Sequence, residues 1–133
     1  MKVYFDNAAS TKILPASAEK MVEVLMDYYA NPGASSVMGM EADNILKDSA
    51  KTLSRLINCN ENEIYFTSGG TEGDNWAIFG TAEGYIRSGK HMVTTAIEHP
   101  AVSKPFAALE EKGWEVTYLP VDEKGYVSTE DIK

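Results

Sequence analysis

The 133-residue chain carries 20 acidic and 12 basic residues, and its formal net charge is -8. The basic residues are scattered rather than clustered, which excludes a nucleic-acid backbone as the partner. A hydrophobic content of 44% is ordinary for one globular domain, and no stretch approaches the roughly 20 apolar residues that a membrane-spanning helix requires.

The first residues and the single cysteine indicate the cellular compartment. No apolar segment of signal-peptide length follows Met1, and the lone Cys59 has no partner for an internal disulfide. We therefore expect a cytoplasmic protein.

The first part of the chain predicts a short strand-like run and a helix. Residues 3–5 are apolar and extended in character. Over residues 15–29 the apolar side chains recur at intervals of three and four, and Pro15 suits a first-turn position, so this segment is predicted to be an amphipathic helix. Residues 31–33, Asn-Pro-Gly, end it.

A second helix is predicted after a loop. Residues 34–39 are small and polar enough to indicate a loop. From Ala42 to Ile57 the apolar residues again fall on one helical face, and this helix should end near Asn58.

Residues 63–75 contain the pattern of a strand, a glycine turn and a helix start. Residues 64–67 are β-branched or aromatic, as in a buried strand, and Gly69 and Gly70 permit a tight turn. Thr71 is predicted to cap the helix, with Asp74 completing an imperfect capping box. Such a turn directs backbone N–H groups at one point and suits a phosphate, although a cap without a ligand is the commoner role. It matches neither the Walker loop nor the dinucleotide fingerprint.

The remaining segments alternate between helix and strand. A helix is predicted to about Ser88, with Gly89 as the residue after its end, then a strand at 91–96, a helix from Pro100 to Lys112 and a strand at 114–120. This alternation is the sign of βαβ units and predicts an α/β fold with a mainly parallel sheet.

The end of the chain predicts a helix that has no room to form. Ser128 and Asp131 make a capping-type pair, yet the sequence stops at Lys133. We expect the sequence to be the front part of a longer protein; a disordered tail is the alternative.

Two loops are expected at the ligand-binding edge of the predicted sheet, because ligands bind at the carboxyl ends of parallel strands. They are residues 68–71 and residues 98–100. His99 lies on this edge, whereas His91 begins its strand on the opposite one. With one candidate ligand in view, a metal site is not expected. Cys59 is expected at the amino end of a strand, far from this edge, and is rejected as a nucleophile.

Four motifs in register resemble those of the cysteine desulfurases, a branch of the class V, fold-type I pyridoxal-phosphate enzymes. The resemblance covers the whole chain. The motifs are residues 4–11 (Tyr-Phe-Asp-Asn-Ala-Ala-Ser-Thr), 31–42 (Asn-Pro, then Gly-x-Glu-Ala), 66–75 (Phe-Thr-Ser-Gly-Gly-Thr-Glu, then Asp-Asn) and 98–102 (Glu-His-Pro-Ala-Val).

The resemblance implies a role for particular residues. Gly70 and Thr71 would hold the phosphate of pyridoxal 5′-phosphate (PLP) through backbone N–H groups and the threonine hydroxyl. His99 would stack on the pyridine ring and assist proton transfer, which makes it the catalytic candidate. Three residues would line the substrate side: Asn7, Ala8 and Asn31.

The resemblance also implies a fold and a reaction. Residues 1–14 would be an N-terminal segment, and residues 15–133 the first portion of the PLP-binding large domain, an incomplete three-layer α/β sandwich. The parent protein, expected to be a homodimer, would convert L-cysteine to L-alanine and an enzyme persulfide. The sulfur would pass to acceptor proteins for iron–sulfur cluster or thiocofactor assembly.

The chain departs from the family pattern in three ways. Ser36 stands where the family often has histidine, and Ser10 where it often has threonine. The Schiff-base lysine, the acidic partner of the pyridine nitrogen and the persulfide cysteine belong to later parts of the family's chain, so the 133 residues alone are expected to be inactive. The alternatives are another class V enzyme, such as a selenocysteine lyase or an aminotransferase, and a non-catalytic α/β binding or dimerisation module.

Overall fold

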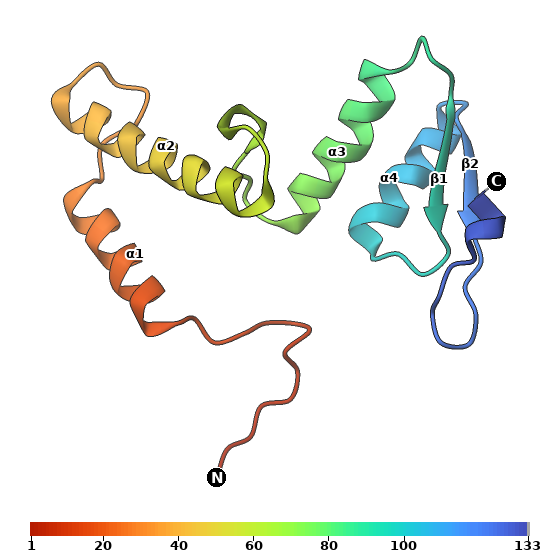
Figure 1. The fold of residues 1–133 in the computed structure, drawn as a ribbon, viewed down its shortest axis with the longest axis horizontal. Helices are drawn as coiled ribbons and strands as arrows, with labels where there is room; N and C mark the ends of the chain where they lie inside the picture. Colours follow the sequence, from red (N-terminus) through yellow and green to blue (C-terminus); the bar gives the residue numbers. More distant parts are fainter. Residues whose placement is uncertain (133) are drawn as a thin grey trace. The chain divides into compact units, whose positions relative to one another are not determined.

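The computed structural model describes residues 1–132. By its internal contacts the chain divides into two compact units, Met1–Tyr65 and Phe66–Lys133, which are described in turn (Figure 1). Among the described residues, no helix has both the length and the apolar character that crossing a membrane requires. The division predicted at residue 14 stays a prediction.

The first unit contains two α-helices. Helix α1 covers Pro15–Asp27, so the predicted helix is confirmed but ends two residues before Tyr29. Helix α2 covers Val37–Ile57 and begins earlier than predicted. The reason is Ser36, whose hydroxyl accepts a hydrogen bond from the Gly39 N–H at 3.1 Å and caps the helix inside the expected loop.

The start of α2 packs tightly on the loop that precedes it. Gly39 is buried, and a Cβ added there would collide with the carbonyl oxygen of Ala34 and lie 2.9 Å from that of Asn31. Only glycine lets this turn of the helix approach the loop so closely. At the other end Asn58 caps α2 in the left-handed conformation, with φ 57°, as predicted for the end of this helix.

The strand predicted at residues 64–67 is wrong. A 3₁₀ turn, η1, covers Glu61–Glu63, and the four residues after it pair with no strand. Their composition favours an extended chain, but a strand also needs a neighbour to accept and donate its ladder hydrogen bonds. Residues 3–5 likewise form no strand, and their side chains are exposed.

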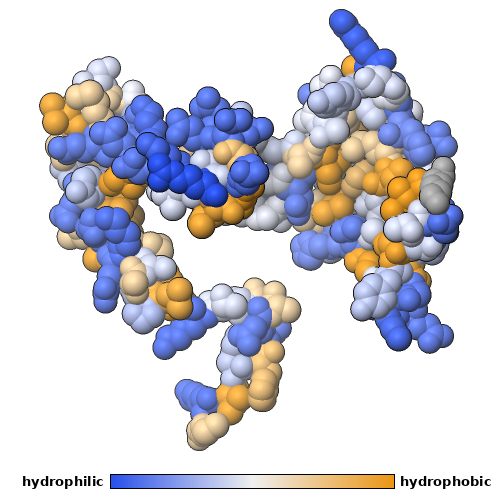
Figure 2. Space-filling model, viewed as in Figure 1, coloured by the Kyte–Doolittle hydropathy of each residue, from blue (hydrophilic) through white to orange (hydrophobic). Residues whose placement is uncertain are grey.

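Much apolar surface remains exposed in the first unit. Figure 2 shows apolar patches along α1 and α2, and the described residues of this unit include only three buried ones. Those three are Gly39, Ala42 and Ser54. Met26 and Leu25 of α1 are 70% and 67% exposed.

The second unit contains a parallel βαβ arrangement. Its elements are helix α3 (Gly70–Gly84), strand β1 (His91–Thr95), helix α4 (Pro100–Glu111), strand β2 (Glu115–Leu119) and the 3₁₀ turn η2 (Thr129–Ile132). The two strands pair in parallel, with His91 opposite Glu115 and Thr95 opposite Leu119. The predicted parallel pairing of these two strands is therefore confirmed.

One apolar cluster holds this unit together. Its buried members come from the two helices: Ile78 and Ala82 of α3, Phe106 and Leu109 of α4. Met92 and Val116, which are partners in the strand register, pack against the cluster from the sheet. Both helices therefore cover the same face of the sheet.

Two boundary predictions for this unit are wrong. The N-cap of α3 is Gly69, and Thr71 lies inside the first turn instead of capping it. Helix α3 ends at Gly84 rather than near Ser88, and a turn leads to Gly89, whose φ of +140° suits glycine. The residues after Ser128 form the short η2 turn, in which the Ser128 hydroxyl accepts from the Glu130 N–H at 3.2 Å.

Candidate functional site

In the second unit, the direction of the chain brings the ends of the strands and the starts of the helices to one side. Strands β1 and β2 end, and helices α3 and α4 begin, at the same end of this unit (Figure 1). The predicted loops 68–71 and 98–100 both lie there, while His91 starts β1 at the opposite end. A parallel βαβ unit places its helix N-termini and strand C-termini at one edge, which is where such folds bind ligands.

The start of α3 carries backbone donors without partners inside the helix. The N–H groups in the first turn of a helix have no carbonyl partner within the helix, and here they belong to Gly70, Thr71 and Glu72. No atom lies within 4 Å of a Cβ added at Gly69 or Gly70. Thr71 is exposed, so its hydroxyl is accessible beside these donors. The positive end of the helix dipole adds to their attraction for an anion.

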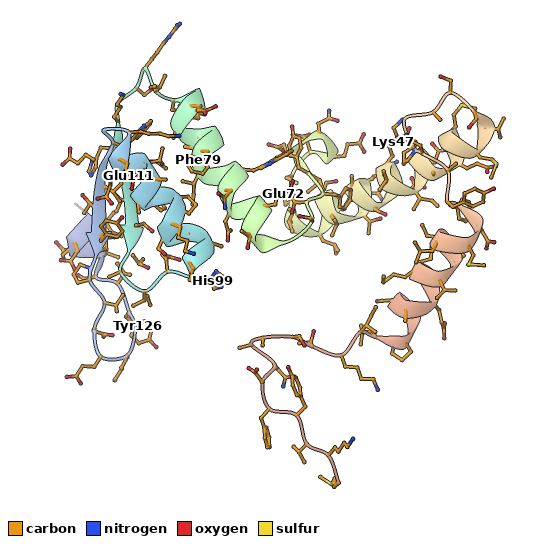
Figure 3. The ribbon with its side chains drawn as sticks, turned by 180° about the vertical axis from the view of Figure 1, so that it is seen from behind. Lys47, Glu72, Phe79, His99, Glu111 and Tyr126 are labelled. Atoms are coloured by element: carbon orange, nitrogen blue, oxygen red, sulfur yellow. The ribbon has the colours of Figure 1, made fainter. Side chains whose placement is uncertain are left out.

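Glu72 is hydrogen-bonded to Ser68, which precedes the two glycines. One oxygen of its carboxylate, Oε2, accepts hydrogen bonds from the Ser68 N–H at 2.6 Å and from the Ser68 hydroxyl at 2.7 Å (Figure 3). The backbone bond and then the hydroxyl bond from Ser68 lower the pKa of Glu72 below its ordinary 4.5, and partial burial opposes them weakly. The carboxylate is therefore ionised at neutral pH.

Two further side chains donate hydrogen bonds to carbonyl groups of the same turn. The Thr67 hydroxyl donates to the Gly69 carbonyl at 3.1 Å, and the Asn75 amide donates to the Thr71 carbonyl at 2.7 Å. These bonds fix the path of the backbone, and so they fix where the first-turn N–H groups point.

His99 caps helix α4 with its own ring. Its Nδ1 accepts a hydrogen bond from the Ala101 N–H at 3.0 Å, and the side chain is exposed at the N-terminus of α4 (Figure 3). A ring nitrogen that accepts a hydrogen bond carries no proton, so in the neutral ring the proton sits on Nε2. The imidazole is thus fixed in position with Nε2–H directed away from the helix backbone. Before it in the chain, Glu98 accepts from the Thr95 hydroxyl at 2.7 Å.

The predicted substrate-side residues belong to the first unit. Asn7 and Ala8 lie in an exposed turn closed by the hydrogen bond from the Ala9 N–H to the Asp6 carbonyl, at 3.1 Å. The Asn31 amide oxygen accepts from the Gly33 N–H at 2.9 Å. Their role beside a substrate stays a prediction.

Cys59 also belongs to the first unit, just after α2. Its thiol lies 3.5 Å from the Asn60 carbonyl and is partly buried. Because residues 64–67 form no strand, its predicted place at the amino end of one is wrong. Within residues 1–132, no three His, Cys, Asp or Glu side chains gather as ligands for a metal ion.

Sequence reasoning missed two features of this site. The first is the Glu72–Ser68 pair, for which the signal is a serine four residues before a glutamate across a glycine turn. The second is the capping role of His99, for which the signal is Pro100 at the first helical position.

The chain belongs to the class-V aminotransferase family, which it matches over residues 3–133. It is 44% identical over 131 residues to a NifS/IcsS protein homolog of Lactobacillus delbrueckii subsp. bulgaricus, covering 98% of this chain and 34% of that protein. It is 41% identical over 132 residues to the cysteine desulfurase IscS of Clostridium botulinum, covering 99% of this chain and 33% of that protein. The chain thus spans about a third of the length of these relatives.

Solved structures agree with this assignment. A NifS-like protein superposes with a TM-score of 0.94 at 35% identity, over 99% of this chain and 36% of its own. SspA, solved in complex with cysteine, superposes with a TM-score of 0.89 at 33% identity, over 97% of this chain and 37% of its own. The predicted fold class is confirmed: an α/β arrangement with a small parallel sheet, as in an incomplete large domain of fold-type I.

Proposed function

We propose that this chain is the amino-terminal part of a PLP-dependent cysteine desulfurase and that it binds the phosphate and ring of the cofactor. The observation that carries the proposal is the start of α3, where the first-turn N–H groups have no carbonyl partner within the helix and the space beside Gly69 and Gly70 is open. This start lies at the strand-end edge of the unit that also bears His99. The cysteine desulfurases among the relatives support the choice of reaction.

The residues present fit a phosphate group. Gly70 and Thr71 offer N–H groups at the positive end of α3, and the exposed Thr71 hydroxyl adds a donor. The space beside Gly69 and Gly70 is open, so a bulky anion can approach the backbone closely. The site needs no lysine to hold the phosphate, since backbone dipoles supply the attraction.

His99 fits the role of a ring partner. Its imidazole is exposed, and the cap bond to Ala101 holds the ring in one orientation. An aromatic face fixed in this way can stack on the pyridine ring, and Nε2 can donate or accept a proton at the substrate or cofactor. Asn7, Ala8 and Asn31 are proposed to line the substrate side.

The reaction proposed for the parent protein takes sulfur from L-cysteine and leaves L-alanine and a protein persulfide. PLP, when bound, supplies the electron sink for this chemistry. This chain contributes binding and orientation. We propose that the 133 residues alone do not desulfurate cysteine, because the family's cofactor-linked lysine and persulfide cysteine lie in later parts of its sequence. The parent is proposed to act in the cytoplasm as a homodimer that passes sulfur to acceptor proteins.

A titration of the ¹⁵N-labelled chain tests the cofactor site. Pyridoxal phosphate, inorganic phosphate and pyridoxal without phosphate are added in turn while the amide spectrum is followed. We expect both phosphate compounds to shift Gly70 and Thr71, and the pyridoxal compounds to shift His99. Phosphate shifts that are spread evenly over the chain would contradict the proposal.

The parent protein tests the reaction itself. The full-length protein is purified and assayed for PLP content and for sulfide released from L-cysteine in the presence of a thiol reductant. L-selenocysteine and amino-acceptor assays serve as the comparison with other class V enzymes. We expect PLP and sulfide; a protein without PLP, or with PLP and only aminotransferase activity, would contradict the desulfurase assignment.

A further inference from the structure

The carboxylate of Glu72 spans the turn that carries the proposed phosphate site. From the first turn of α3 it reaches back to Ser68, and a single oxygen takes both the N–H and the hydroxyl of that residue. Figure 3 shows Glu72 at the start of α3, next to the segment that leads into the helix. The two glycines lie inside the loop that this contact closes.

Gly69 and Gly70 cannot hold the turn by themselves. Neither has a side chain, and no atom lies within 4 Å of the position that a Cβ would take. Glycine also has the widest choice of backbone conformations. The contacts from Glu72 to Ser68 restrain the turn, together with the bonds to the Gly69 carbonyl from the Thr67 hydroxyl and the Gly73 N–H, and the bond from the Asn75 amide to the Thr71 carbonyl.

Glu72 also divides the backbone donors between the protein and an anion. Its carboxylate takes up the Ser68 N–H and hydroxyl, whereas the N–H groups of Gly70 and Thr71 lie in the first turn of α3 and have no carbonyl partner within the helix. An ionised carboxylate beside an anion site repels the anion, so its charge opposes binding while its hydrogen bonds arrange the donors. The two effects have opposite signs and can be separated.

We propose that Glu72 is a positioning residue for the phosphate group of the cofactor, acting through Ser68 on the N–H groups of Gly70 and Thr71. This inference rests on the proposed function. It assigns to a negative side chain a net favourable effect on binding a negative ligand.

Three variants of the full chain separate positioning from charge. Glu72→Ala removes both the charge and the acceptor, whereas Glu72→Gln removes the charge and keeps an oxygen that can accept from Ser68. Asp74→Asn makes the same charge change within the first two turns of α3, at a residue that takes no part in the Ser68 bonds. The dissociation constant for inorganic phosphate is measured from the amide shifts of Gly70 and Thr71, and the amides of β1 and β2 report that each variant is folded.

We expect Glu72→Ala to weaken phosphate binding by about tenfold, as for the loss of a hydrogen bond to a charged group, and Glu72→Gln to weaken it less. Asp74→Asn should bind phosphate as tightly as the unsubstituted 133-residue chain does, or more tightly. If both Glu72 variants bind phosphate as tightly as the unsubstituted chain or more tightly, the charge of Glu72 has the larger effect. The positioning role is then overturned, and the phosphate site stands. If the parent chain shows no phosphate shift at this turn, both the site and the positioning role are overturned.

Discussion

The Nδ1 of His99 accepts the N–H of Ala101 at 3.0 Å, so one ring both caps helix α4 and faces the proposed ligand edge. The cap bond occupies one nitrogen and leaves the other for chemistry. A single side chain therefore has a structural role and a proposed catalytic role, and substitution can separate them.

We expect His99→Ala and His99→Asn to differ in stability but not in cofactor binding. Alanine removes the cap and should cost about 1 kcal/mol of unfolding free energy, whereas asparagine is among the best N-cap residues and should restore it. Both remove the aromatic ring and should weaken PLP binding alike. Urea unfolding measures the first effect and PLP titration the second. An asparagine variant that binds PLP like the parent chain would contradict the stacking role.

The cap bond also predicts the tautomer of His99. In the neutral ring we expect the proton on Nε2, since Nδ1 accepts from Ala101. Long-range ¹H–¹⁵N correlation spectra of the ring distinguish the two nitrogens. A protonated Nδ1 would show that the cap bond does not persist in solution.

Two glycine substitutions should change stability in opposite directions. Gly39→Ala puts a methyl group against the carbonyl oxygens of Ala34 and Asn31, and we expect it to destabilise the chain by about 1 to 3 kcal/mol. Gly80 lies in the interior of α3, with nothing within 4 Å of an added Cβ, so Gly80→Ala should stabilise by about 1 kcal/mol. Thermal and urea unfolding measure both. Equal changes in unfolding free energy for the two variants would mean that α2 does not pack closely on the loop before it.

Glu72 should make stability depend on pH in the acid range. Its folded-state pKa is lowered by the bonds from Ser68, so its contribution is fully present above the ordinary value of 4.5 and is lost as the pH falls through the folded-state value. We expect the difference in unfolding free energy between the parent chain and Glu72→Gln to shrink as the pH falls below that ordinary value. Urea unfolding over a pH series measures it, with Asp74→Asn as the charge control. A constant difference would contradict the assignment.

Local patterns predicted those elements that local physics determines. The spacing of apolar residues gave α1 and most of α2, and the alternation of segments gave β1, α4 and β2 with their parallel pairing. These elements complete their hydrogen bonds or their packing within a short stretch of chain. The glycine turn before α3 was also predicted, because a glycine pair at a helix start has a direct geometric meaning.

The errors arose where a residue has more than one compatible role. Residues 64–67 have the composition of a strand, but a strand forms only against a neighbour. Thr71 is a good cap by type, yet Gly69 ends the extended segment and the helix starts before Thr71. Ser36 caps α2 from within a segment whose composition indicated a loop. In each case the outcome depends on the path of the backbone, which side-chain type alone does not fix.

The pairing of β1 with β2 has a consequence for handling the protein. Within residues 1–132 each strand has one neighbour, so its other edge presents a row of backbone N–H and C=O groups to the solvent. Such an edge accepts any extended segment that can complete the ladder, whether from elsewhere in the same polypeptide or from another copy. We therefore expect the 133-residue chain to associate through these edges less when it is dilute. Charged substitutions at outward-facing positions of the edge strands should keep it monomeric.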